Sequence, residues 1–280
     1  MPESLQEFLN RKPDLDEVAA MRKANAVEQW DSAHPHGMMI EKGKGPYLEG
    51  KVKQKDGTVE PVKVIDAHGQ ILCNAAGYNN PEVEAARALA RERGVDAFSN
   101  NFHSPIVEWA RAVLLDSLGQ WREAYKLLFV TSGTEANDAL RRVACAQGGG
   151  QAEFINLREG YSGAGYGANA ACGNPVWKGK STPSLPGMHF VSPTRESLME
   201  ILGDIPRGHY PAAMFEAGNL GVGGFYTIED EFLRQMAEEV RKRKGDVYPD
   251  EVQTGLGRTG RAFWASQKIF EGLTPPPAGM

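Results

Sequence analysis

The chain has 280 residues, of which 24% are charged, and a formal net charge of −5. A chain of this length can bury a substantial core, so we expect one large α/β domain or a domain and a half. The acidic balance gives no general attraction to nucleic acid, and no nucleic-acid partner is expected. The basic run at 241–244 ends a predicted helix with an acidic first turn, a distribution that the helix dipole favours.

The three cysteines, Cys73, Cys145 and Cys172, are far apart and form neither a metal-binding spacing nor a disulfide framework. They predict a reducing compartment. No apolar run approaches membrane-spanning length, and the N-terminus lacks the positive start and apolar core of a signal peptide. We therefore expect a cytoplasmic protein with no membrane partner. The pair His34 and His36 has no third ligand nearby, so no metal site is predicted.

The first 120 residues predict helices around one short hairpin. Residues 4–31 have helical periodicity, interrupted at Pro13. An Asp-Gly pair within 50–60, flanked by valines, predicts two short strands joined by a tight turn. Prolines at helix-opening positions predict two further helices, over 81–94 and 104–119.

Strands and helices alternate in the rest of the chain. The expected strands are 126–130, 153–157, 189–191 and 212–215, and the expected helices are 133–146, 194–203, 264–270 and one from Thr227, as its N-cap, to Gly245. This alternation is typical of an α/β fold with a mostly parallel sheet flanked by helices. Ligands of such folds lie at the carboxyl ends of the strands.

The most informative segment is Thr-Ser-Gly-Thr-Glu-Ala-Asn at 131–137, between a predicted strand and a predicted helix. The free N–H groups of a first helical turn point outward, and the helix dipole favours an anion there. Ser132, Gly133 and Thr134 are small enough for close approach of a phosphate, and two of them add hydroxyl donors. Helix capping alone explains such a turn about equally well. The assignment therefore depends on a second segment.

That second segment is Asp-Glu-Val-Gln-Thr-Gly-Leu-Gly-Arg-Thr-Gly at 250–260. Together the two segments resemble the class III aminotransferases of the ornithine, acetylornithine and 4-aminobutyrate type, which use pyridoxal phosphate. Further ordered matches extend the resemblance from about Gly45 to about Pro275, and they lie at 45–48, 77–81, 99–102, 161–163 and 173–175. The resemblance implies the major domain of a pyridoxal-phosphate-dependent transferase of fold type I, incomplete in this chain.

The resemblance also assigns the cofactor-binding residues, which are Ser132, Gly133, Thr134, Tyr161, Glu216, Asp250 and Gln253. The backbone at 133–134 would hold the phosphate. Asp250 would pair with the pyridine nitrogen and keep it protonated, and Gln253 would bond the ring hydroxyl. Tyr161 would stack on the ring face, and Glu216 would lie near the ring.

The same resemblance implies a domain division and a set of partners. Residues 1–60 would form the N-terminal segment of a small domain, and residues 61–280 the pyridoxal-phosphate-binding major domain, truncated at its C-terminal end. The expected reaction, part of amino-acid metabolism, transfers an amino group between an amino acid or ω-amino compound and a 2-oxo acid. Family members are usually homodimers with a pocket shared between subunits, so an intact member is expected to dimerise.

No catalytic residue is assigned. The family's Schiff-base lysine follows a Gly-Val-x-Pro-Asp segment, which begins here at 272–275 and departs from the pattern at 276–280. By family spacing that lysine would fall just beyond Met280. Lys268 is the nearest lysine but comes too early, in a predicted helix. The chain as given is therefore expected to be inactive as a transaminase.

Two other interpretations remain open. A catalytically dead, non-enzymatic cofactor-binding or interaction protein of the same fold would explain why Ser162, Ala164 and Ala217 replace the family's His, Arg and Pro. A dinucleotide-dependent dehydrogenase would use the G-x-G-x-x-G pattern at 255–260, although no βαβ unit follows that pattern. The sequence does not specify the amino donor or acceptor.

Overall fold

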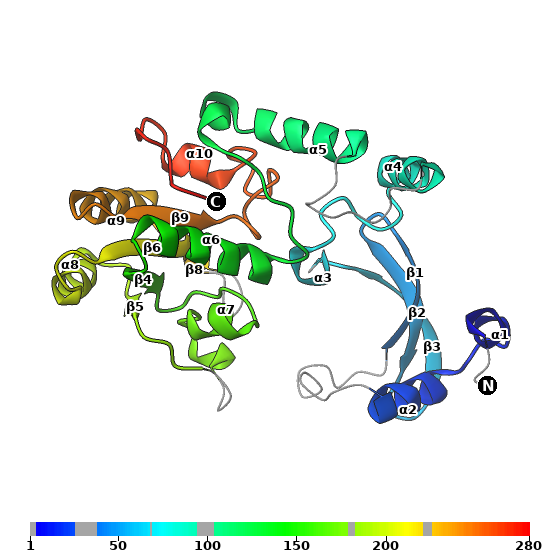
Figure 1. Ribbon diagram of the computed structural model, residues 1–280. Helices are drawn as coiled ribbons and strands as arrows, with labels where there is room; N and C mark the ends of the chain where they lie inside the picture. The colour runs from blue at the N-terminus through cyan, green and yellow to red at the C-terminus, as the bar shows by residue number, and fades with distance from the viewer. Residues whose placement is uncertain (1–3, 26–37, 68, 94–103, 179–182, 221–225) are drawn as a thin grey trace. The chain divides into compact units, whose positions relative to one another are not determined.

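The structure, a computed structural model, describes residues 4–25, 38–67, 69–93, 104–178, 183–220 and 226–280. It divides into two units, residues 1–96 and 97–280 (Figure 1). The family match at 99–102, which by resemblance is a loop on the substrate side, lies outside the described residues. The histidine pair and the predicted helical residues 26–31 also lie outside them.

The first unit contains an antiparallel sheet of three strands, in the order β1 (Met38–Lys44), β2 (Tyr47–Lys53) and β3 (Val59–Ile65). Asp56, in the turn between β2 and β3, accepts hydrogen bonds from the N–H and the hydroxyl of Thr58, at 2.9 and 2.6 Å. These contacts and the antiparallel pairing confirm the predicted hairpin. The helices of this unit are α1 (Leu5–Asn10), α2 (Leu15–Asn25), α3 (Gly69–Leu72) and α4 (Pro81–Glu92).

The break between α1 and α2 falls at Pro13, as predicted. The domain boundary expected at residue 60 falls inside β3. The assignment of residues 1–60 and 61–280 to a small and a major domain stays a prediction.

The second unit contains a parallel sheet of four strands in the order β5-β4-β6-β9. The strands are β4 (Ala152–Leu157), β5 (Met188–Val191), β6 (Tyr210–Glu216) and β9 (Asp246–Asp250). A two-stranded antiparallel ribbon joins β7 (Asn219–Leu220) to β8 (Tyr226–Thr227). The helices are α5 (Pro105–Asp116), α6 (Gly133–Gln147), α7 (Tyr166–Ala170), α8 (Arg195–Asp204), α9 (Asp230–Lys242) and α10 (Ala265–Ile269), with 3-10 turns at η1 (Gly119–Ala124) and η2 (Pro175–Trp177).

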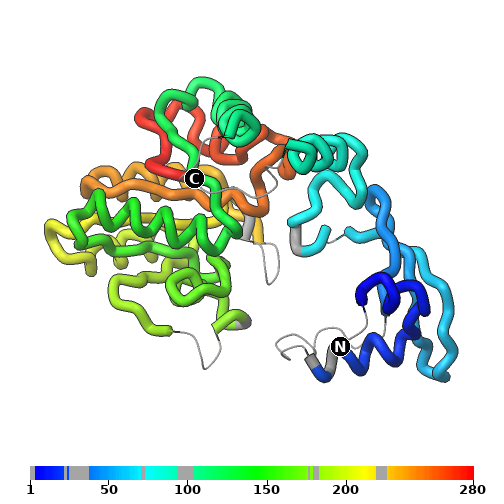
Figure 2. The backbone as a smooth tube through the Cα atoms, turned by 45° about the vertical axis from the view of Figure 1, so that its right-hand side comes forward, coloured from blue at the N-terminus to red at the C-terminus, as the bar shows by residue number. Residues whose placement is uncertain are grey.

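Helices cover both faces of this sheet, so its central strands are buried on both sides (Figure 2). On one face, Ala144 of α6 packs with Phe154, Ala212 and Tyr248. On the other face, the alternate strand residues pack against α8 and α9; they include Ile155, Leu157, Ala213, Phe215 and Val247. The predicted α/β fold with a mostly parallel sheet is confirmed, and α6 lies where its first turn meets the strand ends.

Two local predictions are wrong. Residues 126–130 form no strand, because no described strand pairs with them and extended backbone without a ladder is not a strand. Thr227 is not the cap of α9, because it pairs with Asn219 in the β7–β8 ribbon, and Glu229 takes the N-cap position instead. The acidic first turn and basic last turn of α9 are as predicted.

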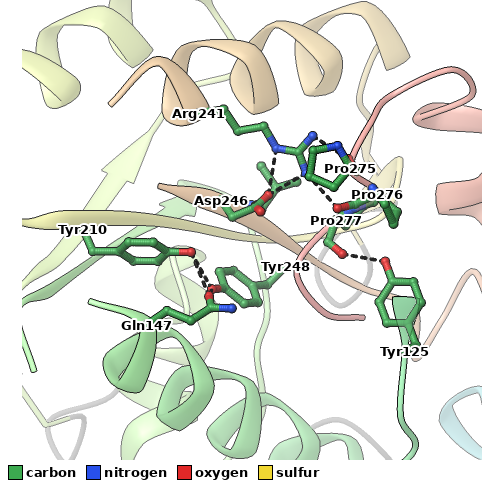
Figure 3. A network of polar contacts seen from close by, with 10 residues as sticks. Tyr125, Gln147, Tyr210, Arg241, Asp246, Tyr248, Pro275, Pro276 and Pro277 are labelled. Atoms are coloured by element: carbon green, nitrogen blue, oxygen red, sulfur yellow. Dashed lines mark hydrogen bonds and ion pairs between the residues drawn. The ribbon is translucent and has the colours of Figure 1, made fainter. Parts of the chain in front are cut away.

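The edge of the sheet at β9 is covered by the residues that end the chain (Figure 3). The guanidinium of Arg241 donates to the carbonyls of Pro275 and Pro276, at 2.6 and 2.8 Å, and pairs with Asp246 at 2.8 Å. The hydroxyl of Tyr125 donates to the carbonyl of Pro277 at 2.6 Å. The three prolines have no N–H, and Ala278 donates its N–H to the carbonyl of Val247 in β9 at 3.1 Å, so the segment covers the edge without forming a further strand. Pro249 is tolerated in β9 because β9 is the edge strand among the described residues, and an edge strand needs N–H groups for only one neighbouring strand.

We expect Arg241→Ala to lower the free energy of unfolding by about 2–3 kcal/mol, because it leaves Asp246 and two proline carbonyls without their charged donor. Urea unfolding measures the loss, and limited proteolysis should then cut within 275–280. Lys242→Ala is the matched control, since the Lys242 side chain is 64% exposed and its ion pair should contribute less than about 1 kcal/mol. Equal losses in the two variants would contradict the proposed anchoring.

Candidate active site

The first turn of α6 presents two free backbone donors. Ser132 is the N-cap, and its oxygen accepts a hydrogen bond from the N–H of Glu135 at 3.2 Å. The Glu135 carboxylate in turn accepts from the N–H and hydroxyl of Thr131, at 2.8 and 2.7 Å. No described residue accepts from the N–H groups of Gly133 and Thr134. They remain available, with the Ser132 hydroxyl hydrogen, for an anion at this helix terminus.

Two neighbouring segments approach this turn so closely that a side chain larger than that of glycine would clash at each contact. A Cβ atom on Gly133 would lie 2.5 Å from Cγ2 of Val252, which follows β9. A Cβ atom on Gly163, whose φ of +121° also favours glycine, would lie 2.4 Å from the Thr134 hydroxyl oxygen. The predicted phosphate turn therefore lies against the segment that follows β9 and the loop that follows β4.

Asp250 is the last residue of β9 and is held by groups on two segments. Its Oδ2 accepts from the side-chain amide of Asn137 at 2.7 Å, and its Oδ1 accepts from the N–H of Val252 at 2.9 Å. Burial raises the pKa of Asp250, and the hydrogen bonds and the charge of Arg141 oppose that rise. The residue keeps some accessible surface. It is thus an oriented, desolvated carboxylate that can still reach a ligand.

Glu216, the last residue of β6, joins two other predicted site residues. Its Oε1 accepts from the backbone N–H of Tyr161 at 2.8 Å, and its Oε2 accepts from the side-chain amide of Gln253 at 3.2 Å. The residue is only 4% exposed. Its carboxylate therefore holds together the loop after β4 and the segment after β9.

Gln253 carries the least satisfied polar atom of the group. Its Oε1 is buried and has no hydrogen-bond partner among the described residues. A buried carbonyl oxygen without a donor costs about 1–3 kcal/mol, so this oxygen favours a ligand hydroxyl or N–H group. Tyr161 and Gln253 both donate to Glu216. The ring of Tyr161 makes an edge contact with the ring of Trp177, at 5.3 Å between centroids.

These seven predicted residues gather at the carboxyl ends of the parallel strands β4, β6 and β9. The site offers a desolvated carboxylate, an amide oxygen that lacks a donor, an aromatic ring and two free N–H groups. This set of groups suits a ligand with a flat heteroaromatic ring and a phosphate. Pyridoxal phosphate has a basic ring nitrogen, a ring hydroxyl and a phosphate, which these groups match in kind. The residues present therefore fit that coenzyme.

Comparison with known proteins agrees with this fit. The family model of class-III aminotransferases matches residues 29–276. The chain belongs to the class-III aminotransferase family. Members of this family use pyridoxal phosphate, and the predicted family, coenzyme and fold are confirmed.

Similar sequences within this family include acetylornithine aminotransferases. The mitochondrial acetylornithine aminotransferase of Yarrowia lipolytica is 28% identical over 242 residues, which are 83% of this chain and 54% of that protein. The acetylornithine aminotransferase of Bacillus subtilis is 31% identical over 137 residues, 49% of this chain and 34% of that protein. The chain thus spans about half the length of the relatives it matches, or less.

Solved structures show the same fold. The ornithine aminotransferase of Toxoplasma gondii superposes with a TM-score of 0.76 at 20% identity, covering 97% of this chain and 61% of that one. The taurine:2-oxoglutarate aminotransferase of Bifidobacterium kashiwanohense, solved with pyridoxal phosphate and glutamate, gives a TM-score of 0.75 at 18% identity, covering 92% of this chain and 60% of that one. A phospholyase from Arthrobacter gives 0.71 at 20% identity, covering 93% of this chain and 61% of that one.

Lys268 does not join the class-III site. Its ammonium group pairs with Glu271 at 2.6 Å, and its side chain is 51% exposed. It is a surface lysine of α10, as the sequence predicts.

Among the replaced family positions, Ala217 continues the β6–β9 pairing by donating its N–H to the carbonyl of Asp250, and Ser162 donates its N–H to the sulfur of Cys172.

Asn137 is a site residue that the sequence reasoning did not single out. It is the last residue of the Thr-Ser-Gly-Thr-Glu-Ala-Asn segment and is 5% exposed. Its position one helical turn after Gly133 was the available signal, because residues four apart share a helix face. Helix α6 thus presents free N–H groups at its first turn and, one turn later, a side-chain amide to Asp250.

Proposed function

We propose that residues 1–280 bind pyridoxal phosphate at the first turn of α6 and the ends of β4, β6 and β9. A protein that joins them to a Schiff-base lysine would transfer an amino group between an amino acid or ω-amino compound and a 2-oxo acid. The observation that carries the proposal is a pair of hydrogen-bonded groups beside the free N–H groups of Gly133 and Thr134. Glu216 accepts from Tyr161 and Gln253, and Asn137 links Asp250 to the carbonyl of Ser162, next to Tyr161. Pyridoxal phosphate, when bound, supplies an electron sink for chemistry at the amino carbon.

Each proposed role follows from the atom that the structure makes available. The N–H groups of Gly133 and Thr134 would donate to the phosphate, and the Ser132 hydroxyl would add a third donor. The Asp250 carboxylate would accept from the ring nitrogen and hold a proton there. The unpartnered Oε1 of Gln253 would accept from the ring hydroxyl. Tyr161 would cover one face of the ring and exclude water from it.

A non-enzymatic coenzyme-binding protein is the second candidate. The observation that favours it is the commitment of Lys268 to Glu271, away from the site residues. This candidate predicts the same binding and no turnover by any form of the protein.

Purified residues 1–280 should bind pyridoxal phosphate saturably, in a titration followed by absorbance and by quenching of tryptophan fluorescence. Pyridoxal, which lacks the phosphate, should bind about 10-fold or more weakly, because charge-assisted hydrogen bonds contribute about 1.5–3 kcal/mol each. No saturable binding would refute the proposed site. With an amino donor and a 2-oxo acid these residues should show no transamination, and turnover would contradict the missing-lysine hypothesis.

The proposal extends to assembly and location. A homodimer and a cytoplasmic location are expected for an intact family member, although the Yarrowia relative is named as mitochondrial. None of the described helices combines the length and the apolar character needed to cross a bilayer. Light scattering of an intact protein that contains these residues tests the first expectation, and cell fractionation tests the second.

A further inference from the structure

The amide of Asn137 joins the two sides of the proposed coenzyme site. Its Nδ2 donates to Oδ2 of Asp250 at 2.7 Å and to the backbone carbonyl of Ser162 at 3.1 Å. Ser162 directly follows Tyr161, the proposed ring-stacking residue. One amide group therefore links the loop after β4 to the end of β9, and Asn137 and Asp250 are 113 positions apart in the sequence.

The donor has no alternative role within the fold. Asn137 lies inside α6, where the backbone needs no side-chain cap, and both of its amide hydrogens are used by these two acceptors. An asparagine is neutral in a helix interior at best, so helix propensity does not explain it. The tie between Asp250 and the loop explains its position.

A second buried donor on the same helix face supports the carboxylate by its charge. Arg141 lies four residues after Asn137 and is 6% exposed, with a long ion pair of 3.4 Å to Asp138. Its Nε and Nη2 have no partner among the described residues. Its positive charge lowers the pKa of Asp250, against the effect of burial. Helix α6 thus brings both a hydrogen bond and a positive charge to one carboxylate.

We propose that Asn137 is a positioning residue that holds the Asp250 carboxylate toward the ring nitrogen of the coenzyme. This inference rests on the proposed function, because it assigns Asn137 a role in binding pyridoxal phosphate. Asn137 does not contact the reacting atoms. It acts through Asp250, so its effect should depend on the presence of the ring nitrogen.

The test compares two ligands on the purified chain 1–280. The first ligand is pyridoxal phosphate, and the second is its analogue in which a CH group replaces the ring nitrogen. Asn137→Ala should weaken the affinity for pyridoxal phosphate about 10-fold or more, as expected for a lost hydrogen bond to a charged group. Its affinity for the analogue should change less than about threefold, because the analogue makes no bond to Asp250.

Two further variants separate this role from a loss of packing. Asn137→Leu keeps the volume without the amide, so it should match Asn137→Ala in ligand preference. Asn156→Ala is the matched control. Asn156 is equally buried, at 2% exposed, but it donates to the carbonyls of Phe154 and His189, away from Asp250. This control should leave the ratio of the two affinities unchanged.

The outcomes distinguish the two proposals. If the unmodified chain binds neither ligand, the proposed function fails. If it binds both ligands and the Asn137 variants lose both equally, or lose neither, the positioning role is overturned while the coenzyme site stands. Circular dichroism of each variant shows whether it is folded, and a folded Asn137→Leu chain is sufficient for the comparison.

Discussion

Asp250→Asn should lower the affinity of residues 1–280 for pyridoxal phosphate about 10- to 100-fold and should, in the same variant, stabilise the ligand-free chain. The affinity falls because an amide in place of the carboxylate removes a charge-assisted hydrogen bond to the ring nitrogen, worth about 1.5–3 kcal/mol. The coenzyme titration described above measures this loss.

The stability rises because of the direction of the pKa shift. Burial raises the pKa of Asp250 in the folded chain, so the folded state binds the proton more tightly than the unfolded state. The contribution of Asp250 to stability is therefore full below the ordinary aspartate pKa of about 3.9 and is lost as the pH rises through the raised value. At neutral pH the ionised carboxylate carries the cost of burial, which an amide removes. Against this gain, the single oxygen of the amide can accept from Asn137 or from Val252 but not from both, so the rise should be small.

Thermal unfolding checks this sign. At pH 7 the midpoint of Asp250→Asn should exceed that of the unmodified chain, by about 2–4 °C for each kcal/mol regained. The difference should shrink as the pH approaches about 4. Asp246→Asn is the control at the other end of β9, where the carboxylate pairs with Arg241 at 2.8 Å; it should lower stability and leave coenzyme affinity unchanged. A destabilised Asp250→Asn chain that binds the coenzyme normally would contradict both assignments.

Gly173→Ala should lower the free energy of unfolding by about 3 kcal/mol, because its Cβ would lie 2.1 Å from the carbonyl oxygen of Leu157 and 2.4 Å from that of Arg158. Both contacts are backbone atoms, which cannot rotate away as a side chain can. The N–H of Gly173 also donates to the carbonyl of Gly160 at 2.9 Å. The substitution should therefore displace the loop that carries Tyr161 as well as destabilise the chain.

Urea unfolding measures the loss, and the coenzyme titration measures the effect on the loop. The matched control is Gly203→Ala in α8, where an added Cβ meets no atom within 4 Å and a helix favours alanine by about 1 kcal/mol. It should be neutral or slightly stabilising and should bind the coenzyme normally. If the two alanine variants unfold at the same urea concentration, the close backbone approach at Gly173 is not structurally important.

The residues of the candidate site could be predicted from the sequence, but the contacts between them could not. The segment 131–137 and the Asp-Glu-Val-Gln-Thr-Gly segment supplied five of the seven predicted residues, and Tyr161 and Glu216 came from the wider resemblance. The structure brings all seven to the carboxyl ends of the parallel strands. The roles of these residues stay predictions until the coenzyme titrations are done. The Asn137–Asp250 bond and the unsatisfied Gln253 oxygen were not predictable, since each depends on side chains from elements far apart in the sequence that meet at the strand ends.

The sequence by itself determined the order and kind of most elements, because hydrophobic periodicity, prolines and capping residues act within a few residues of one another. It also determined that Asp250 and Glu216 come at strand ends. The tertiary structure alone decided that residues 126–130 remain unpaired and that Thr227 joins a ribbon instead of capping α9. Pairing requires a second strand from elsewhere in the chain, so a local pattern of apolar residues cannot specify whether that partner is present.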